Sequence, residues 1–405
     1  MNRMEREKYS IKDLIRFPTP FFLIDADELK WLFDSMRSAF SAVWPNLEIG
    51  YSFKTNSIPW LLTWFKERGV SAEVVSSDEY NLAEHLGFEK IIFGGPYKGE
   101  RELIEACEKG YTVNIDSASE LARLLSQKPK LKNIWKVGLR VNFDLEKECP
   151  GETVMGSEIS RFGICYESGE LEKSIAQIES SSHVMLAGLH LHNSTKTRSL
   201  NIYKAISEKL IEIVDRYKLN LEYIDVGGGF YGGLPDKPSF SDYAACISTV
   251  LKKRFNSTAT RLIIEPGISL VGSPISYVCK AQSAKTIKNE KVVTFDGSLI
   301  DVNPFMRSRN LMIEHLSQNK EQSTTQQVLG GYTCMEDDRF QGMMTNYSIE
   351  IGDLIVIDKV GAYSITFGNF FIQYPPQIIA KVANQYLIVR EKITAETYTK
   401  LSSKL

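Results

Sequence analysis

Apolar side chains recur with two different periods along the chain and divide it into two regions. Between about residues 34 and 272, short apolar runs alternate with stretches such as 78–86, 100–109 and 199–217, whose apolar positions repeat every three to four residues. The runs predict strands that begin near Leu47, Ser71, Lys90, Tyr111, Trp135, Val184, Leu221 and Arg261. Eight strands with helices between them, over roughly 240 residues, predict a (β/α)8 barrel of the TIM type.

After residue 272 the pattern changes to strands separated by short turns, as in KVVTFDG and DLIVIDKVGAY. We therefore expect an α/β barrel over 34–272 and a second, all-β domain, a sandwich or barrel, formed by 1–33 and 273–405. The competing architecture is a doubly wound sheet, which would usually carry a glycine-rich turn after its first strand. Here KTNSIPW follows that strand instead, so the barrel is favoured.

Composition limits the classes of partner and compartment. The chain has 405 residues, 43% of them apolar, and a net charge of −2, so nothing indicates a nucleic-acid or membrane-surface partner. No apolar run approaches the roughly 20 residues of a membrane span, and the charged N-terminus lacks the apolar core of a secretory signal. The six cysteines form no CxxC pair, which argues against a zinc site or a disulfide framework. We expect a cytoplasmic protein with free thiols.

The predicted strand ends carry the candidate chemistry, because a barrel of this type places its active site at the carboxyl ends of its strands. These ends hold Lys54, Arg140, His190, His192, the glycines Gly227, Gly228 and Gly229, and Glu265. Each has an ordinary structural explanation on its own. The two histidines raise the question of a metal, but no third ligand of matching spacing appears, so no metal is expected. Together, a lysine for a Schiff base, N–H donors for a phosphate, a carboxylate and a flat ring match the needs of pyridoxal phosphate.

The motifs appear in an order that resembles a known family. YSFKTN, VVSSDE, RFG, HLHNST, DVGGGF, EPG, GGYTCMEDD and GAY are similar to motifs of the fold type III pyridoxal-phosphate decarboxylases, the group of diaminopimelate and ornithine decarboxylases. The resemblance implies loss of the α-carboxylate from an amino acid or an amino-acid conjugate. Two alternatives remain: an amino-acid racemase on the same barrel, and a catalytically inactive regulatory homologue.

The resemblance also implies roles for individual residues and an assembly. Lys54 would bind the cofactor covalently, His192 would stack on its ring, and Glu265 would pair with the pyridine nitrogen. Cys334 would return a proton to the substrate from the partner subunit, which makes a homodimer with shared active sites the expected assembly. The remaining cofactor contacts would come from Arg140, Ser194, Thr195, Gly227, Gly228, Gly229, Gly267 and Tyr363, and the substrate contacts from Met335, Asp338 and Tyr363, with Asp338 beside the same interface.

The chain departs from the family pattern at informative positions. Ile268 follows EPG where the family usually has an arginine that helps to bind the phosphate, and Met335 follows Cys334 where an acid often reads a distal amine. FGGPYK and HLHNST look more like the branch that decarboxylates amino-acid conjugates in siderophore and other secondary metabolism. We expect two polar loops, 144–157 and 315–325, to shape the substrate site.

Overall fold

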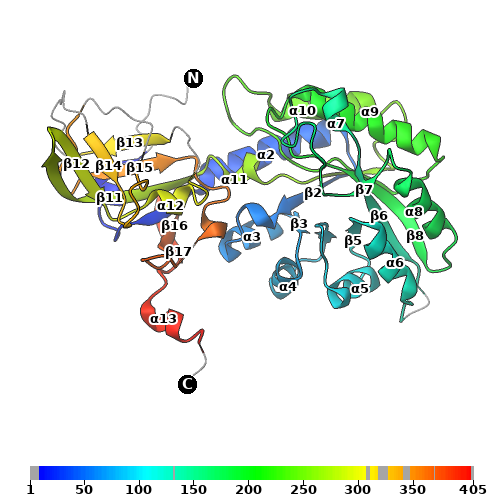
Figure 1. Cartoon of the computed structure of the whole chain (residues 1–405), viewed down its shortest axis with the longest axis horizontal. Coiled ribbons are helices and arrows are strands. Elements are labelled where there is room, and N and C mark those ends of the chain that lie inside the picture. Colours follow the sequence, from blue (N-terminus) through cyan, green and yellow to red (C-terminus); the bar gives the residue numbers. More distant parts are fainter. Residues whose placement is uncertain are drawn as a thin grey trace. The chain divides into compact units, whose positions relative to one another are not determined.

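The computed structural model describes residues 9–130, 133–306, 311–317, 327–340, 347–368 and 370–402. The chain forms two compact units, one made of Leu32–Leu270 and the other of Met1–Trp31 together with Val271–Leu405. The first unit alternates strands and helices and the second is built around a mixed sheet (Figure 1).

Eight parallel strands of the first unit close into a barrel. They are β2 (Leu47–Ser52), β3 (Ser71–Val74), β4 (Ile91–Phe93), β5 (Thr112–Ile115), β6 (Trp135–Asn142), β8 (Val184–Leu191), β9 (Tyr223–Asp225) and β10 (Arg261–Ile264). β2 pairs with both β3 and β10, and the pairing of β5 with β6 completes the ring. A short strand, β7 (Ile164–Cys165), extends the edge of β6. The predicted fold class is confirmed, and each predicted strand begins within about two residues of the observed one.

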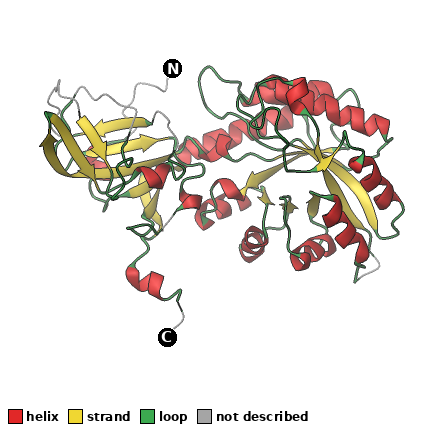
Figure 2. Ribbon diagram, viewed as in Figure 1, coloured by secondary structure: helices red, strands yellow, loops and turns green. Residues whose placement is uncertain are grey.

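Helices follow the barrel strands and lie outside them (Figure 2). They are α2 (Ala26–Val43), α3 (Pro59–Lys66), α4 (Ser77–His85), α5 (Glu100–Glu108), α6 (Ala118–Ser126), α7 (Leu145–Glu148), α8 (Glu170–Glu179), α9 (Leu200–Arg216), α10 (Phe240–Leu251) and α11 (Ile268–Val271). Several begin at a side-chain cap: the hydroxyl of Ser76 accepts the Glu79 N–H at 3.2 Å, and Ser239 with Asp242 forms a capping box. These caps fix where α4 and α10 begin.

One tyrosine fills the middle of the barrel, and two glycines leave the space for its ring. Tyr223 projects from β9, and its hydroxyl donates to Asn114 Oδ1 at 2.8 Å. A Cβ atom at Gly138 would lie 2.1 Å from this hydroxyl, and one at Gly188 would lie 2.3 Å from the ring. Ile92, Ala187 and Ile263 pack around the same tyrosine. The interior is therefore a packed core, and the polar chemistry lies at the rim.

The second unit contains an eight-stranded mixed sheet. Its strands are β1 (Phe21–Asp25), β11 (Ile275–Ile287), β12 (Glu290–Phe295), β13 (Met312–Leu316), β14 (Gln327–Gly330), β15 (Leu354–Asp358), β16 (Gln377–Val382) and β17 (Gln385–Arg390). β1, from the N-terminal part, pairs antiparallel with β11 and parallel with β16. Short helices α1 (Ile11–Leu14), α12 (Leu299–Val302) and α13 (Ala395–Thr399) complete the unit. Phe21, Leu23, Val278, Val356 and Ile379 belong to its core.

The two loops expected to shape the substrate site differ from the prediction. The segment 144–157 contains the short helix α7. Within 315–325, His315 and Leu316 end strand β13, and His315 is buried against Asp353 with its Nε2 2.8 Å from Oδ2. Residues 318–325 lie outside the described residues. The sequence did not indicate a strand here because His315 is polar. In the fold, the buried carboxylate of Asp353 is the partner of the His315 ring.

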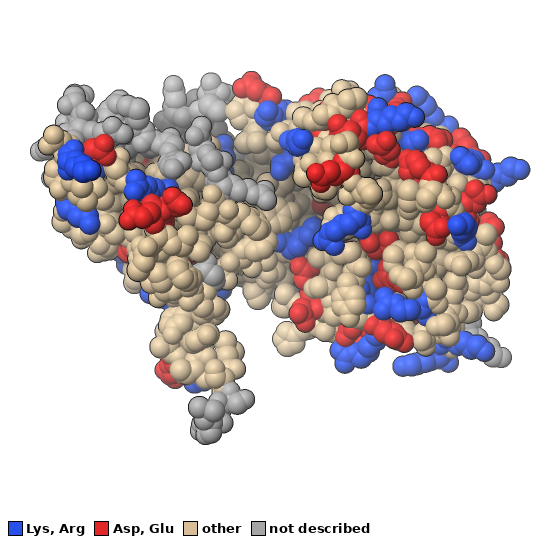
Figure 3. All heavy atoms as spheres, in the orientation of Figure 1, with Lys and Arg blue, Asp and Glu red and all other residues tan. Residues whose placement is uncertain are grey.

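The surface charges of the barrel unit agree with the balanced composition of the chain. On the face drawn in Figure 3, acidic and basic side chains lie next to one another over the barrel unit. None of the helices in the described parts of the chain has both the length and the apolar character that crossing a bilayer requires.

Candidate active site

Lys54 lies just beyond the first barrel strand, in a single 3₁₀ turn, η2 (Phe53–Thr55). Its Nζ donates to Glu73 Oε2 at 2.8 Å, and the Ser52 hydroxyl donates to the same oxygen at 2.5 Å. Glu73 is buried, whereas 43% of the Lys54 side chain is exposed. Ser52 and Glu73 are register partners on β2 and β3. The lysine predicted from the sequence therefore reaches the open end of the barrel, held by an acid that the sequence analysis did not assign.

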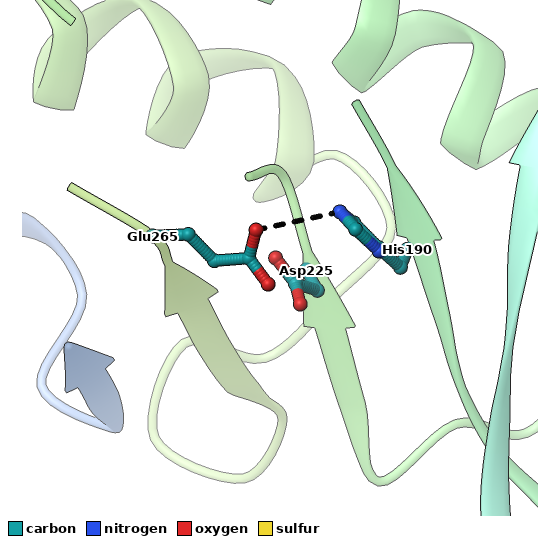
Figure 4. A group of neighbouring side chains, drawn as sticks. All are labelled: His190, Asp225 and Glu265. Atoms are coloured by element: carbon teal, nitrogen blue, oxygen red, sulfur yellow. Dashed lines mark ion pairs between the residues drawn. The ribbon is translucent and has the colours of Figure 1, made fainter. Parts of the chain in front are cut away.

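Three buried side chains meet at the ends of β8, β9 and β10 (Figure 4). His190, Asp225 and Glu265 place one possible ligand atom each within 4.8 Å of one another, and His190 Nε2 lies 3.6 Å from Glu265 Oε2. Both ring nitrogens of His190 and Oε1 of Glu265 are buried without a hydrogen-bond partner. Asp225 accepts from Asn114 Nδ2 at 3.1 Å and from the Gly227 N–H at 2.9 Å. Buried polar atoms without partners indicate a place where a polar ligand binds.

Burial controls the protonation of these groups. Burial raises the pKa of Asp225 to about 7, and it raises the pKa of Glu265 well above its usual value, with the neighbouring Asp225 and Glu73 adding to the rise. Burial, Arg140 and Lys54 together lower the pKa of His192 to about 3. The pKa of His190 is also lowered well below its usual value, first by burial and then by Arg140. The histidines are neutral near pH 7, and the two carboxyls retain a proton between them.

The possible metal ligands that meet in the structure differ from those that the sequence suggested. The sequence offered His190 and His192 without a third ligand, whereas the described residues join His190 to two carboxylates instead. The His192 ring lies parallel to that of His190, at 11° and with centroids 6.3 Å apart, and packs on the glycines. Two carboxylates and a histidine could bind a metal ion, and they could equally bind the protonated nitrogen of an aromatic ring.

The glycine turn, Gly227, Gly228 and Gly229, leaves no room for side chains. A Cβ at Gly227 would lie 2.4 Å from the His192 ring, and one at Gly228 would lie 1.9 Å from the Glu265 carbonyl oxygen. Gly227 and Gly229 have φ angles of 66° and 85°, which L side chains rarely adopt. The missing side chains let this turn pack directly against His192 and the Glu265 carbonyl. Backbone N–H groups in such a turn are of the kind that binds phosphate.

Gly267 joins the first and last strands in the same way. A Cβ there would lie 2.1 Å from Thr55 Oγ1, and the Ser52 N–H donates to the Pro266 carbonyl at 3.1 Å. The charge of Lys54 also reduces the rise in the pKa of Glu265. Lys54 and Glu265, which are over two hundred residues apart in the sequence, therefore belong to one site.

Arg140 is held at the rim by a buried chain of charges that the sequence analysis missed. Its Nη1 donates to Asp116 Oδ1 at 3.1 Å, and the Asp116 N–H donates to Glu120 Oε2 at 2.8 Å. Glu120 in turn pairs with Lys98, whose side chain is completely buried, at 3.0 Å. Arg140 is the register partner of His190 on the neighbouring strand. The network fixes a guanidinium beside the buried His190.

Ser194 and Thr195 follow the end of β8 and contact the loop that contains Thr153 and Val154. Thr195 forms an antiparallel bridge with Thr153, and the Val154 N–H donates to the Ser194 carbonyl at 3.0 Å. A hollow of about 700 Å³ lies here, lined by residues 142–147 and 153–162 with Asn193 and Ser194. The loop that was expected to shape the substrate site thus lies against the predicted phosphate residues.

The other predicted residues belong to the β-rich unit. Cys334 is an exposed free thiol, and 38% of Met335 is exposed. Asp338 is buried and accepts from the N–H groups of Leu299 and Thr333 at 2.8 and 3.1 Å, so it joins the start of α12 to its own turn. Tyr363 has a φ of 57°, an uncommon value for a non-glycine residue. The roles expected of these four residues remain predictions.

The residues of the barrel unit fit pyridoxal phosphate. An exposed lysine, a bare glycine turn, a flat neutral histidine and a buried carboxylate with an unpartnered oxygen lie at one end of the barrel. A carboxylate in this position can stabilise a protonated pyridine nitrogen. The N–H groups of Gly228 and Gly229 can bind the phosphate, whereas that of Gly227 donates to Asp225. Glu73 and Asp225 could have been suspected from the sequence as acids inside apolar strand runs, SAEVV and YIDVGGG.

Comparison with known proteins gives consistent matches over nearly the whole chain. Residues 28–272 match the family described as "Pyridoxal-dependent decarboxylase, pyridoxal binding domain". Diaminopimelate decarboxylase of Methanocaldococcus jannaschii is 26% identical, covering 96% of this chain and 91% of that protein. L-Glutamyl-[BtrI acyl-carrier protein] decarboxylase of Niallia circulans is 28% identical, covering 94% and 93%. The crystal structure of the M. jannaschii enzyme superposes with a TM-score of 0.87 at 24% identity, covering 98% of this chain and 94% of that one.

Proposed function

The chain belongs to the pyridoxal-dependent decarboxylases, and on this premise we propose that it removes the α-carboxylate of an amino acid whose distal end carries a conjugated group. The family match confirms the cofactor, pyridoxal phosphate, and the class of reaction that the motifs implied. The convergence of Lys54, Glu265 and the glycine turn at one barrel end is the observation that carries the proposal.

The conjugated substrate is supported by one departure from the family and by one relative. Met335 occupies the position where an acid often reads the distal amine of a diamine-type substrate, and the acids Glu336 and Asp337 are displaced from it by one and two residues. The relative from N. circulans acts, by its name, on a glutamyl group attached to a carrier protein. An apolar contact at Met335 suits an acyl or amide continuation of the side chain.

Lys54 and its neighbours prepare the covalent attachment of the cofactor. Glu73 holds the Lys54 ammonium in the open mouth. The neutral amine that Lys54 gives on losing a proton is the nucleophile. Ser52 donates to the same Glu73 oxygen and so fixes the orientation of that carboxylate. When bound, the cofactor takes up the electrons that are released as the carbon–carboxylate bond breaks.

Glu265 controls the charge at the ring nitrogen. Its carboxyl shares a buried site with Asp225, and the pair retains a proton because two negative charges cannot persist there together. A protonated pyridine nitrogen would place a positive charge beside the Glu265 carboxyl and so lower its pKa. Glu265 would thereby keep the ring protonated, and His192 would pack on its face.

Cys334 is the acid in this proposal, and it acts across a dimer. The thiol would donate a proton to the α-carbon after carbon dioxide leaves. It belongs to the β-rich unit of the partner subunit, together with Tyr363, so that each site is shared between two chains. Released amine would then leave the site as Lys54 recovers the cofactor.

A substrate panel tests this function. Diaminopimelate, ornithine, lysine and glutamate are compared with N-acyl, citryl and carrier-bound derivatives, and released carbon dioxide is measured. The proposal predicts turnover, with a conjugate giving the highest kcat/KM. Racemisation without carbon dioxide would indicate the racemase alternative, and a purified protein without bound cofactor would indicate the regulatory one. If a free diamino acid were the best substrate, the proposal of a conjugated substrate would be refuted.

A further inference from the structure

We propose that Arg198 supplies the cationic ligand for the cofactor phosphate at a position that the family pattern assigns elsewhere. The inference rests on the proposed function, since it assumes that the glycine turn holds the phosphate of pyridoxal phosphate. Ile268 offers no charge after EPG, while a phosphate dianion held by N–H groups alone would lack a compensating cation.

Three cations close to the barrel rim are already engaged. Lys54 pairs with Glu73, Lys98 with Glu120, and Arg140 with Asp116. In contrast, neither Arg198 nor Lys237 forms an ion pair with a residue that the structure describes. Both lie over the ring of Tyr231, at 5.2 and 5.3 Å from its centroid. Tyr231 follows Gly229 by two positions, so these two positive charges gather directly after the glycine turn.

A hydroxyl fixes the backbone of Arg198 against the same turn. Tyr243 on α10 donates its hydroxyl proton to the Arg198 carbonyl at 2.7 Å and accepts the Tyr231 N–H at 3.3 Å. One side chain thus ties the loop after β8 to the loop after β9. The backbone of Arg198 has a φ of 50°, an uncommon value that such fixed surroundings can maintain.

A second tyrosine links this cluster to the glycine turn itself. Tyr203 donates its hydroxyl proton to the Gly228 carbonyl at 2.9 Å, and a Cβ at Gly229 would lie 3.3 Å from the same hydroxyl. Burial raises the pKa of Tyr203 well above its usual value, and the charge of Arg198 opposes that rise. Tyr203 thus joins α9, which begins two residues after Arg198, to the glycine turn.

Arg198 suits the role better than Lys237. Arg198 is half-buried and its backbone is fixed, whereas Lys237 is exposed. A guanidinium can also bind two phosphate oxygens at once, which an ammonium cannot do in the same fixed geometry. Glu152 lies close by but accepts from the hydroxyls of Thr197 and Ser199.

The test compares two forms of the cofactor that differ only in the phosphate. Full-length protein is titrated with pyridoxal phosphate and with pyridoxal, and the absorbance of the lysine-bound cofactor gives each Kd. Arg198→Met should weaken pyridoxal phosphate roughly 10- to 100-fold, the loss of a hydrogen bond to a charged group, and pyridoxal less than threefold. Arg198→Lys should fall between wild type and Arg198→Met.

Matched controls separate this role from a structural one. Arg216 also lies over tyrosine rings, at the far end of α9, and Arg216→Met should leave both constants unchanged. Lys237→Met should weaken pyridoxal phosphate less than Arg198→Met does. Equal losses for both cofactor forms, or none for either, would overturn the role of Arg198 while leaving the decarboxylase intact. A wild-type protein that binds no pyridoxal phosphate would overturn the proposed function as well.

Discussion

Removing the buried ammonium of Lys98 should strongly destabilise the barrel unit. Its Nζ donates to both oxygens of Glu120, at 3.0 and 3.2 Å, and to the Gly95 carbonyl at 3.0 Å. None of its side chain and only 3% of that of Glu120 is exposed. Lys98→Met leaves the Glu120 charge buried and unpaired, which typically costs about 3–5 kcal/mol. Because Glu120 also accepts the Asp116 N–H, the loss should reach Arg140 too.

Urea unfolding followed by tryptophan fluorescence measures this loss. Of the five tryptophans only Trp31 belongs to the β-rich unit, so the signal reports mainly on the barrel. With a slope of about 3 kcal/mol/M, the midpoint should fall by about 1–2 M. The matched control is Lys136→Met, which breaks a pair with Glu222 whose side chains are 53% and 47% exposed, and should cost less than about 1 kcal/mol.

A double-mutant cycle tests the cause. Glu120→Gln keeps an oxygen for the Asp116 N–H but removes the charge. Combined with Lys98→Met, it should be less destabilising than the sum of the single changes by about 2–3 kcal/mol, as coupled partners are. Additive losses, or a loss below about 1 kcal/mol in Lys98→Met, would refute the reasoning that an unpaired buried charge dominates.

Four further outcomes are expected. Glu265→Gln should retain the cofactor, seen by its absorbance, but lower kcat roughly 100-fold or more, since a neutral amide no longer favours a protonated ring; an unchanged kcat would remove Glu265 from the mechanism. Burial raises the pKa of Glu79 to about 7. The folded state therefore binds more protons than the unfolded state between about pH 4.5 and 7, and stability falls as pH rises. Glu79→Gln should make that fall smaller in urea unfolding and leave the part that Asp225 and Glu265 contribute, and an unaltered pH dependence would contradict it. Gly228→Ala should weaken pyridoxal phosphate in the same absorbance titration, because its Cβ would lie 1.9 Å from a backbone oxygen, and wild-type affinity would show that the turn can shift. Inactive Cys334→Ala and Lys54→Ala proteins, mixed until subunits exchange, should regain roughly a quarter of wild-type activity, since half the dimers are mixed and each has one intact site; no recovery despite exchange would argue against shared sites.

The barrel was predictable because its strands are short apolar runs bounded by polar residues. Lys54 and Glu265 could be assigned to one rim without any structure, because parallel strands end at the same edge of a barrel. The bare turn at Gly227 was also visible in the sequence, as a run of residues that only a close approach or a positive φ explains.

The partners of these residues were not predictable. Glu73 and Asp225 are single acids within apolar runs, and nothing in such a run tells whether the carboxylate faces a lysine, a second carboxylate or water. Lys98, within FGGPYK, was not singled out in the sequence, although it is completely buried against Glu120, which is 22 residues further on. Pairings between elements depend on side-chain direction and burial, which a single sequence specifies only through the finished fold.

The tyrosine that fills the barrel has a consequence for how this sequence can change over evolutionary time. Tyr223 occupies the volume that Gly138 and Gly188 leave open, so the three positions share one fixed space. An alanine at Gly188 would be tolerated only in a lineage whose residue 223 has already become smaller. One at Gly138 would also need Asn114 to move, because the new Cβ would lie 2.4 Å from Asn114 Oδ1. Among descendants of this chain the three positions should therefore vary together, as a single inherited unit, while their neighbours on the same strands drift independently.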